Sequence, residues 1–240
     1  MSHPAPKKLS VVVPCFNESA TLETLVARVQ NANTSGLDLE IVIVDDASMD
    51  DSLERARNLA KADPRIQVFT HDKNQGKGAA LRTAYKEATG DIVLVQDADL
   101  EYDPTEYPKL LHPILDDRAD VVYGSRFRGG QEVRILYFWH TVGNRFLTLL
   151  SNMMTDMTLS DMETCYKVYR TETLRQIQVV ENRFGIEPEV TAKIAHLKPR
   201  PRIYEVGISY YGRTYEEGKK IGWKDGVRAI YCIIKYNVFR

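Results

Sequence analysis

The 240-residue chain lacks the features that mark several special classes of protein. Its three cysteines, Cys15, Cys165 and Cys232, show no CxxC spacing, so neither a disulfide framework nor a zinc site is suggested and a reduced, cytosolic setting is expected. No apolar run approaches the roughly 18 residues of a membrane-spanning helix, and residues 1–10 contain no apolar signal-peptide core. A net charge of −1 argues against whole-protein affinity for nucleic acid. We therefore expect a cytoplasmic globular protein that can contact a membrane only peripherally.

The first half of the chain alternates short apolar runs with amphipathic stretches. Apolar runs rich in β-branched residues predict five strands, at 9–13, 40–44, 66–70, 91–96 and 120–123. Helical spacing of apolar residues predicts four helices between them, at about 20–33, from 48 or 50 to 62, 79–88 and 106–115. Repeated β-α units with short connections are typical of an α/β fold with a doubly wound, mainly parallel sheet.

After about residue 130 the alternation changes, although no repeat or low-complexity linker separates the two parts. We predict a long helix over 139–157, strands around 166–169 and 203–210, and helices around 187–196 and 223–236. One face of the long helix is apolar and comprises Phe146, Leu149, Leu150, Met153 and Met157. Such a face is more often part of a core, with a peripheral membrane face as the alternative. We predict a single domain over 1–240, made of a first half up to about residue 130 and a second half over about 131–240.

Four of the predicted strands end in unusually polar segments. These are PCFNE (14–18), DDASMD (45–50), QDADLE (96–101) and GSRF (124–127). Ligands of doubly wound sheets gather at the carboxyl ends of the strands. Helix caps explain one acidic residue in a loop, but adjacent acids on two neighbouring loops repel each other unless a cation neutralises them or some stay protonated. The pattern therefore predicts a cation-assisted site at this edge of the sheet.

Asp97 and Asp99 are the sharpest metal-binding signal. Side chains at positions i and i+2 of an extended segment point the same way, so both carboxylates can face one hard cation. Mg²⁺ or Mn²⁺ prefers a few carboxylate oxygens together with substrate phosphate. A DxD is common by chance, but its place after an apolar strand and opposite a second acidic loop favours a metal site. Glu101, two residues further on, can supply another oxygen or position a water.

The NQGKG loop at 74–78 precedes a predicted helix. It matches neither GxxxxGK[ST] nor GxGxxG, which excludes a P-loop and a dinucleotide fingerprint. One interpretation is a turn whose glycines ease tight backbone angles. The preferred one is that Lys77 and the helix N-terminus offer positive potential to the phosphates of a donor.

These motifs, in this order and spacing, resemble those of family 2 glycosyltransferases with the GT-A fold. The resemblance covers nearly the whole chain, through DMETCYKVYR (161–170), FGIEPEVTAK (184–193), EVGISYYGR (205–213) and EEGKKIGWKDG (216–226). The later motifs resemble the dolichyl- or polyprenyl-phosphate mannose synthase branch. Departures from that branch are Glu101 in place of a frequent Gln, ETCYK in place of SGFR, and an NQGKGAA loop closer to lipid-glucosyl relatives. They leave the transferred sugar open between mannose and glucose.

The resemblance implies an inverting transfer of a hexose from a nucleotide sugar, GDP-mannose or UDP-glucose, to a polyprenyl or dolichyl phosphate. It implies a nucleotide-sugar and metal half up to about residue 130 and an acceptor half over about 131–240. It implies a nucleoside pocket lined by Pro14, Phe16, Glu18, Asp45 and Asp46. It implies a metal ion, Mg²⁺ or Mn²⁺, held by Asp97, Asp99 and Glu101. It places Arg126, Arg213 and Lys219 or Lys220 against the phosphates of donor and acceptor.

The acceptor decides whether the reaction needs a base. A phosphate monoester is already ionised near neutral pH, whereas a sugar or lipid hydroxyl would need a general base, for which Asp161 or Glu163 is the candidate. Asp161 could equally be only a helix or turn cap. His140 and His196 are interpreted as structural.

Two other classes of function compete with a transferase. Sugar nucleotidyltransferases also bind Mg²⁺ on a similar α/β half, but they carry a GxGxR loop after the first strand, where this chain has PCFNE. An inactive binding module is disfavoured by the intact DAD sequence.

The C-terminal end of the chain is basic. From Arg213 to Arg240 it holds seven Lys or Arg against three acids, an excess of +4. Such a segment suits an anionic partner, and either a solvated surface or a lipid contact explains it. With the nearby apolar residues Ile230, Ile233, Ile234 and Val238, it predicts weak, salt-sensitive binding to a membrane surface.

Overall fold

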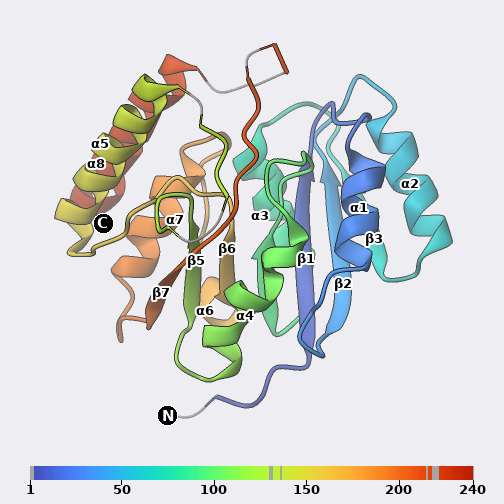
Figure 1. The fold of residues 1–240 in the computed structure, drawn as a ribbon, viewed down its shortest axis with the longest axis horizontal. Coiled ribbons are helices and arrows are strands. Elements are labelled where there is room, and N and C mark those ends of the chain that lie inside the picture. Colours follow the sequence, from blue (N-terminus) through green and yellow to red (C-terminus); the bar gives the residue numbers. More distant parts are fainter. Residues whose placement is uncertain (1–2, 130–131, 136, 215, 218–221, 240) are drawn as a thin grey trace.

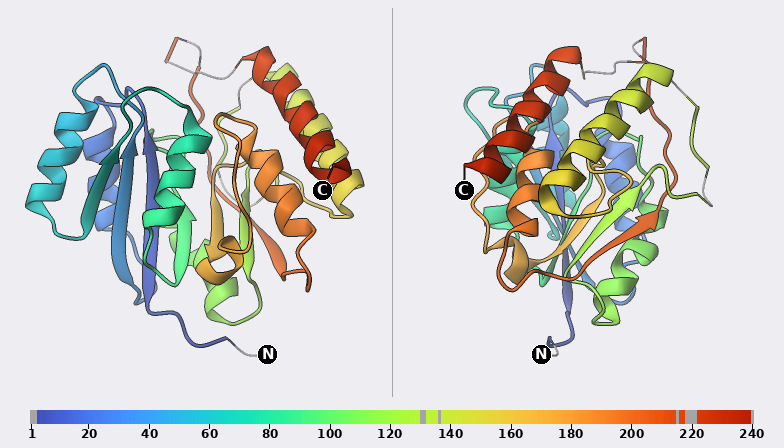
Figure 2. Two further views of the ribbon diagram at one scale, coloured as in Figure 1. Left: turned by 180° about the vertical axis from the view of Figure 1, so that it is seen from behind. Right: turned by 90° about the vertical axis from the view of Figure 1, so that its left-hand side faces the viewer.

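The computed structural model describes residues 3–129, 132–135, 137–214, 216–217 and 222–239. A seven-stranded sheet forms the middle layer, with helices on both of its faces (Figures 1 and 2). The strand order is β3-β2-β1-β4-β6-β5-β7, so both halves of the chain contribute to one sheet. The α/β fold with a mainly parallel sheet is thus confirmed.

The first half of the chain follows the predicted elements closely. They are β1 (Lys8–Cys15), α1 (Leu22–Gln30), β2 (Asp38–Asp45), α2 (Ser52–Ala62), β3 (Ile66–Thr70), α3 (Lys77–Glu87) and β4 (Ile92–Val95). β1 pairs in parallel with both β2 and β4, and β2 pairs in parallel with β3. The carboxyl ends of these strands therefore meet at one edge, as the polar segments require.

The second half of the chain adds the remaining strands of the sheet. Its elements are η1 (Pro104–Glu106), α4 (Tyr107–Leu115), β5 (Val121–Ser125), α5 (Phe138–Thr155), β6 (Lys167–Arg170), α6 (Thr171–Leu174), α7 (Ile186–Ala195), β7 (Ile203–Gly207) and α8 (Trp223–Val238). β6 runs antiparallel between β4 and β5, and β5 pairs in parallel with β7. Because β6 returns against its neighbours, the segment that precedes it, residues 161–166, lies at the same edge as the ends of β4 and β5.

The apolar face predicted for the long helix is divided in the structure. Phe146, Leu149 and Met153 are exposed, contrary to the favoured interpretation, whereas Leu150 and Met157 are partly buried and pack against the core. The fully buried positions of α5 are Thr148, Ser151 and Thr155. The buried side packs on α7 and α8, and Thr148 Oγ1 accepts a hydrogen bond from the backbone of Met162. Short side chains with local hydrogen bonds allow this close approach, which larger apolar ones would prevent.

Among the described residues, no helix is both long and apolar enough to cross a membrane.

Candidate active site

A cavity of about 510 Å³ opens at the carboxyl ends of β1 and β4. α5, the segment 183–187 and the segment 210–213 complete its wall. Of the residues predicted for the site, those that line it are Pro14, Phe16, Glu18, Asp46, Lys77, Asp97, Asp99, Glu101, Arg126, Glu163 and Arg213. The structure therefore brings together residues that are up to about two hundred positions apart in the sequence. Lys219 and Lys220 lie outside the described residues.

The two aspartates of the DAD sequence both face this cavity, and each has a basic partner. The Lys77 ammonium lies 2.8 Å from Asp97 Oδ1, and the Arg213 guanidinium lies 2.6 Å from Asp99 Oδ2. Burial, together with the neighbouring carboxylates of Asp97 and Glu101, raises the pKa of Asp99 to about 7. The carboxylates thus repel one another strongly enough to favour a cation between them.

Glu101 holds Arg213 in place. Its Oε1 accepts from Arg213 Nε at 3.0 Å, and its Oε2 accepts from the Tyr210 hydroxyl at 2.7 Å. Arg213 also reaches Glu18, with its Nη1 3.5 Å from Glu18 Oε2. This one guanidinium therefore joins three carboxylates that follow two strands, Glu18 after β1 and Asp99 and Glu101 after β4.

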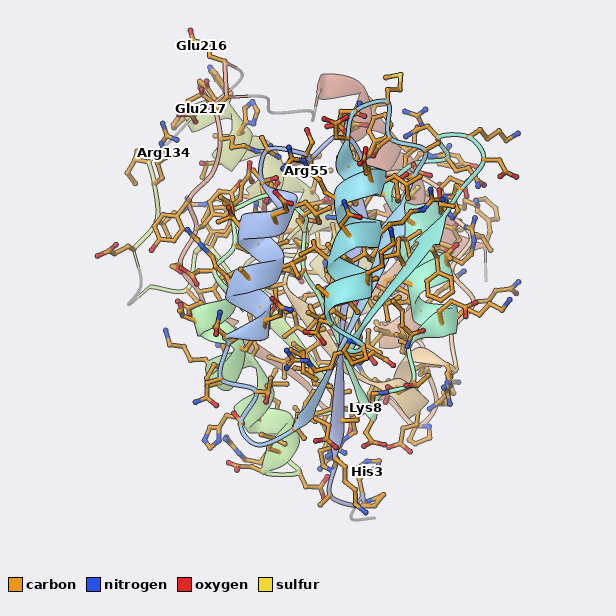
Figure 3. The ribbon with its side chains drawn as sticks, turned by 90° about the vertical axis from the view of Figure 1, so that its right-hand side faces the viewer. His3, Lys8, Arg55, Arg134, Glu216 and Glu217 are labelled. Carbon is orange, nitrogen blue, oxygen red and sulfur yellow. The ribbon has the colours of Figure 1, made fainter. Side chains whose placement is uncertain are left out.

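A second tie keeps the Arg213 segment near the cavity. Arg134 donates to the carbonyl of Gly212 at 3.1 Å and pairs with Glu217 at 2.7 Å (Figure 3). Val133 and Tyr210 form an isolated β-bridge beside it. The segment 132–135 and the described residues of the Arg213 segment, 210–214 and 216–217, thus support each other.

Asp46 organises the NQGKG loop. Its carboxylate accepts from the backbone amides of Gln75 at 3.0 Å and Gly76 at 2.6 Å, and His71 Nδ1 lies 2.6 Å from it. These bonds fix the start of α3, and with it the position of Lys77. Asp46 therefore both lines the cavity and shapes the loop next to it.

Asp45 is buried like Asp46 but does not line the cavity. Its Oδ2 accepts from the backbone of Ser48 at 3.0 Å, while its Oδ1 is buried with no partner among the described residues. It supports the loop behind the cavity wall, and here it does not lie in the wall itself, where the sequence places it.

The glycines of the NQGKG loop are required by their surroundings. Gly76 has φ +104°, in the region that side chains disfavour. A Cβ on Gly78 would lie 2.3 Å from the carbonyl oxygen of Glu181. α3 can therefore begin against the segment 181–183 only with glycine at these positions.

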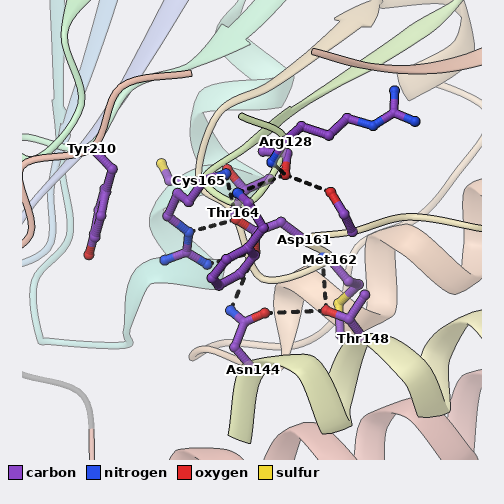
Figure 4. Close-up of polar contacts among 12 residues, drawn as sticks. Arg128, Asn144, Thr148, Asp161, Met162, Thr164, Cys165 and Tyr210 are labelled. Atoms are coloured by element: carbon purple, nitrogen blue, oxygen red, sulfur yellow. Dashed lines mark hydrogen bonds and ion pairs between the residues drawn. The ribbon is translucent and has the colours of Figure 1, made fainter. Parts of the chain in front are cut away.

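Arg126 and Asp161 form a bidentate ion pair. Arg126 Nε and Nη2 lie 2.6 and 2.7 Å from the two Asp161 oxygens. Asn144 of α5 donates to the same carboxylate at 3.3 Å (Figure 4), and the Arg126 guanidinium lies 5.1 Å from the centre of the Tyr210 ring. Asp161 is fully buried. A carboxylate held in this way fixes the orientation of Arg126.

Glu163 has the opposite character. It lines the cavity, yet its Oε1 is buried without a hydrogen-bond partner among the described residues. Burial, reinforced by the nearby Glu187 carboxylate, raises the pKa of Glu163 to about 7. Of the two candidate bases, Glu163 is the one whose environment suits proton transfer near neutral pH.

Sequence reasoning missed several residues of the cavity. They are Asn74, Asn144, Arg183, Phe184, Glu187 and Tyr210, and His140 was interpreted as structural although it lines the cavity. Glu187 pairs with Lys167 and lies 3.6 Å from Lys77. A polar His140 and Asn144 one turn apart on an apolar helix were an available signal. The remaining residues are brought in by tertiary contacts alone.

The carboxylate oxygens at the cavity suit a hard divalent cation. Within the part of the chain that the structure describes, no three His, Cys, Asp or Glu side chains are gathered as a complete cage. Mg²⁺ and Mn²⁺, however, are commonly held by one or two carboxylates plus the phosphates of a substrate. Asp97 and Asp99 offer two such carboxylates at the wall of a cavity large enough for a ligand.

Solved structures share this fold. Glucosyl-3-phosphoglycerate synthase from Mycobacterium tuberculosis, solved with Mn²⁺, UDP and phosphoglyceric acid, superimposes with a TM-score of 0.74 at 19% identity. The match covers 97% of this chain and 79% of that one. This likeness confirms the expected GT-A fold.

Sequence relatives agree with the structural match. Over 96% of its length the chain is 30% identical to a dolichol-phosphate mannosyltransferase of Pyrococcus furiosus, and over 90% it is 29% identical to an undecaprenyl-phosphate mannosyltransferase of Micrococcus luteus. It spans 64% of the former protein and 88% of the latter. The family model of glycosyl transferase family 2 matches residues 10–178, which include the DAD sequence and the Arg126–Asp161 pair. The chain therefore belongs to glycosyl transferase family 2.

Proposed function

We propose that this protein is a metal-dependent, inverting transferase that moves a hexose from a nucleotide sugar to a polyprenyl phosphate. The observation that carries the proposal is one cavity in which the DAD carboxylates face the cations of Lys77, Arg126 and Arg213. Such a cavity suits two phosphorylated substrates that react at the anomeric carbon of the transferred sugar. The names of the two mannosyltransferase relatives support the acceptor class. We propose that both halves of the chain act as one domain.

The donor would lie at the ends of β1 and β4. Pro14, Phe16 and Asp46 would line the nucleoside side, and Asp97 and Asp99 would hold Mg²⁺ or Mn²⁺ beside the diphosphate. The bound metal would supply Lewis-acid stabilisation of the departing nucleoside diphosphate. Glu101 lies beside these aspartates, but both of its oxygens are hydrogen-bonded to Tyr210 and Arg213. We therefore propose that it orients Arg213 more than it binds metal.

The basic side chains would neutralise the charge that develops on transfer. Lys77 at the start of α3 would face the donor diphosphate, and Arg126 would face the acceptor phosphate from the opposite side. The Asp161 carboxylate fixes the plane of the Arg126 guanidinium. An ionised phosphate acceptor then attacks the sugar without a protein base. GDP-mannose and UDP-glucose are the donors to be tested first.

A hydroxyl acceptor is the second candidate, and one observation favours it. Glu163 places a buried, unpartnered carboxylate oxygen at the cavity, with its pKa raised to about 7. This is the environment expected of a general base. In that reaction Glu163, and not Asp161, would take the proton.

The test measures nucleoside diphosphate released from GDP-mannose or UDP-glucose in the presence of Mn²⁺ or Mg²⁺. Release that rises on addition of a polyprenyl phosphate, and is lost in Asp99→Asn, supports the proposal. Asp116→Asn, which changes an exposed aspartate far from the cavity, is the matched control and should keep full activity. Release stimulated by a polyprenol or free sugar, but not by the phosphate, would favour the hydroxyl acceptor. We propose that the protein acts at the cytoplasmic face of a membrane, where such a phosphate lies.

A further inference from the structure

Helix α5 turns its apolar side away from the protein. Its exposed residues include Trp139, 77% exposed, Met153, 74%, and Phe138, 70%. Its fully buried positions carry the small hydroxyl residues Thr148, Ser151 and Thr155, with Leu147, Leu150 and Met154 partly buried beside them. A helix on the surface of a soluble protein has the reverse arrangement. The exposed stripe of α5 therefore needs a partner that covers it.

Helix α8 extends the stripe into a face. It lies beside α5 on one flank of the molecule (Figures 1 and 2). We call the exposed apolar residues of the two helices the α5–α8 face: Phe138, Trp139, Val142, Phe146, Leu149, Met153, Val227, Tyr231, Ile234 and Val238. Of the 17 exposed large hydrophobic residues in the described part of the chain, 13 lie within 135–153 or 227–239. Monomeric soluble proteins rarely expose so concentrated an apolar patch.

The charges on these helices have one dominant sign. α5 carries Arg145 and no acidic residue, and α8 carries Lys224, Arg228 and Lys235 against Asp225. Glu181 also pairs with Arg228 and Lys235, so four cations oppose two anions, an excess of two positive charges. Two copies of this face would bring like charges together, which disfavours a homodimer. An apolar face with a cationic excess is complementary to the interfacial region of an anionic bilayer.

The face also adjoins the cavity. His140 and Asn144 of the same helix line the cavity wall, and Asn144 bonds to the carboxylate that holds Arg126. A partner that covers the outer side of α5 therefore lies within one helix diameter, about 10 Å, of the groups that meet the acceptor phosphate.

We propose that the α5–α8 face docks on the surface of an anionic lipid bilayer. Its apolar side chains would enter the headgroup and upper acyl region, to a depth of about 5–10 Å. The proposal rests on the proposed function only in that the acceptor would lie in the same bilayer. The sequence predicted a membrane contact through Ile230, Ile233, Ile234 and Val238, but Ile233 is fully buried and Ile230 is half-buried. Most of the proposed contact therefore comes from α5. Binding should therefore survive high salt in part, because apolar burial is not screened.

The first experiment measures the environment of Trp139 on the α5–α8 face by fluorescence. The chain has two tryptophans, so Trp223→Phe leaves Trp139 as the sole reporter. Vesicles of phosphatidylcholine and phosphatidylglycerol, without polyprenyl phosphate, should shift its emission to shorter wavelength, and brominated lipids should quench it. Vesicle binding with an unchanged Trp139 spectrum, or no binding at all, would overturn the proposal.

The second experiment compares substitutions. Phe146→Gln with Met153→Gln should weaken vesicle partitioning by at least about tenfold, whereas Met49→Gln, at an 84% exposed position elsewhere, should not. Release of nucleoside diphosphate with a detergent-dispersed acceptor should stay unchanged in all of them. Unchanged partitioning in the double variant, or a dimer in sedimentation analysis that the double variant abolishes, would overturn the bilayer assignment. Because the vesicles contain no acceptor, a failure of the proposed transfer reaction would leave the binding result intact.

Discussion

Replacing Glu163 by glutamine should stabilise the protein at alkaline pH. Burial of this carboxyl, next to the Glu187 carboxylate, raises its pKa from 4.5 to about 7. Between these values the folded chain keeps a proton that the unfolded chain releases, so the free energy of unfolding falls as the pH rises. The full penalty is reached above about pH 7 and amounts to about 3 kcal/mol at most. Glutamine has no such proton to lose, so Glu163→Gln should escape the penalty.

Thermal unfolding between about pH 5 and pH 8.5 measures the effect. The melting temperature of Glu163→Gln should exceed that of the wild type by up to about 6–12 °C at the alkaline end, and the gap should shrink towards pH 5. Glu40→Gln is the matched control of opposite sign. Although burial acts to raise the Glu40 pKa, hydrogen bonds from Lys8, Ser10 and Thr89 hold it at about 2. Glu40→Gln should therefore lose stability across the same range. A stability gap between Glu163→Gln and the wild type that does not change with pH would refute the reasoning.

Three further predictions concern the cavity. Asp97→Ala and Asp99→Ala should each abolish transfer while the far-UV circular dichroism is retained, and full metal-dependent activity in either variant would exclude the metal assignment. Arg213→Ala should weaken binding of the phosphate acceptor more than binding of the donor in calorimetric titrations; the reverse order would place this guanidinium on the donor side. Gly78→Ala should cost about 1–3 kcal/mol in chemical denaturation, because its Cβ would meet the Glu181 carbonyl at 2.3 Å; an unchanged midpoint would show that the segment 181–183 yields freely.

Most of the fold could be predicted from the sequence, because each buried parallel strand is a short run of apolar, mostly β-branched residues. β3 was predicted with its observed bounds, and β1 and β2 are each longer than predicted by a few residues. The antiparallel direction of β6 was not predicted. The direction of a strand depends on the path of the segments that connect it to the rest of the sheet. The sequence of the four residues of β6 does not indicate that direction.

The candidate site was recognisable where it follows strands. Asp97, Asp99 and Arg126 stand directly after apolar runs, so topology alone places them at one edge. Tyr210 and Glu187 come from the second half and meet the cavity through tertiary contacts. Their spacing in the sequence is that of ordinary strand and helix residues. The segments that contain them, 184–193 and 205–213, were noted for their family resemblance, but the resemblance did not single out these two side chains.

The reversal of α5 shows why periodicity alone cannot assign a face to a core. The spacing of Phe146, Leu149 and Met153 correctly indicated an apolar side, but it does not say what that side contacts. The fully buried positions supply the missing information, because Thr148, Ser151 and Thr155 are small enough to pack closely. The hydroxyls of Thr148 and Thr155 donate to the Asn144 side chain and the Ser151 carbonyl, four residues earlier in each case. A helix with large apolar residues on one side and small hydroxyl residues on the other can bury either side. When the hydroxyl side faces the protein, the large apolar residues on the outside are left for a second apolar medium, which under the proposed docking is a lipid bilayer.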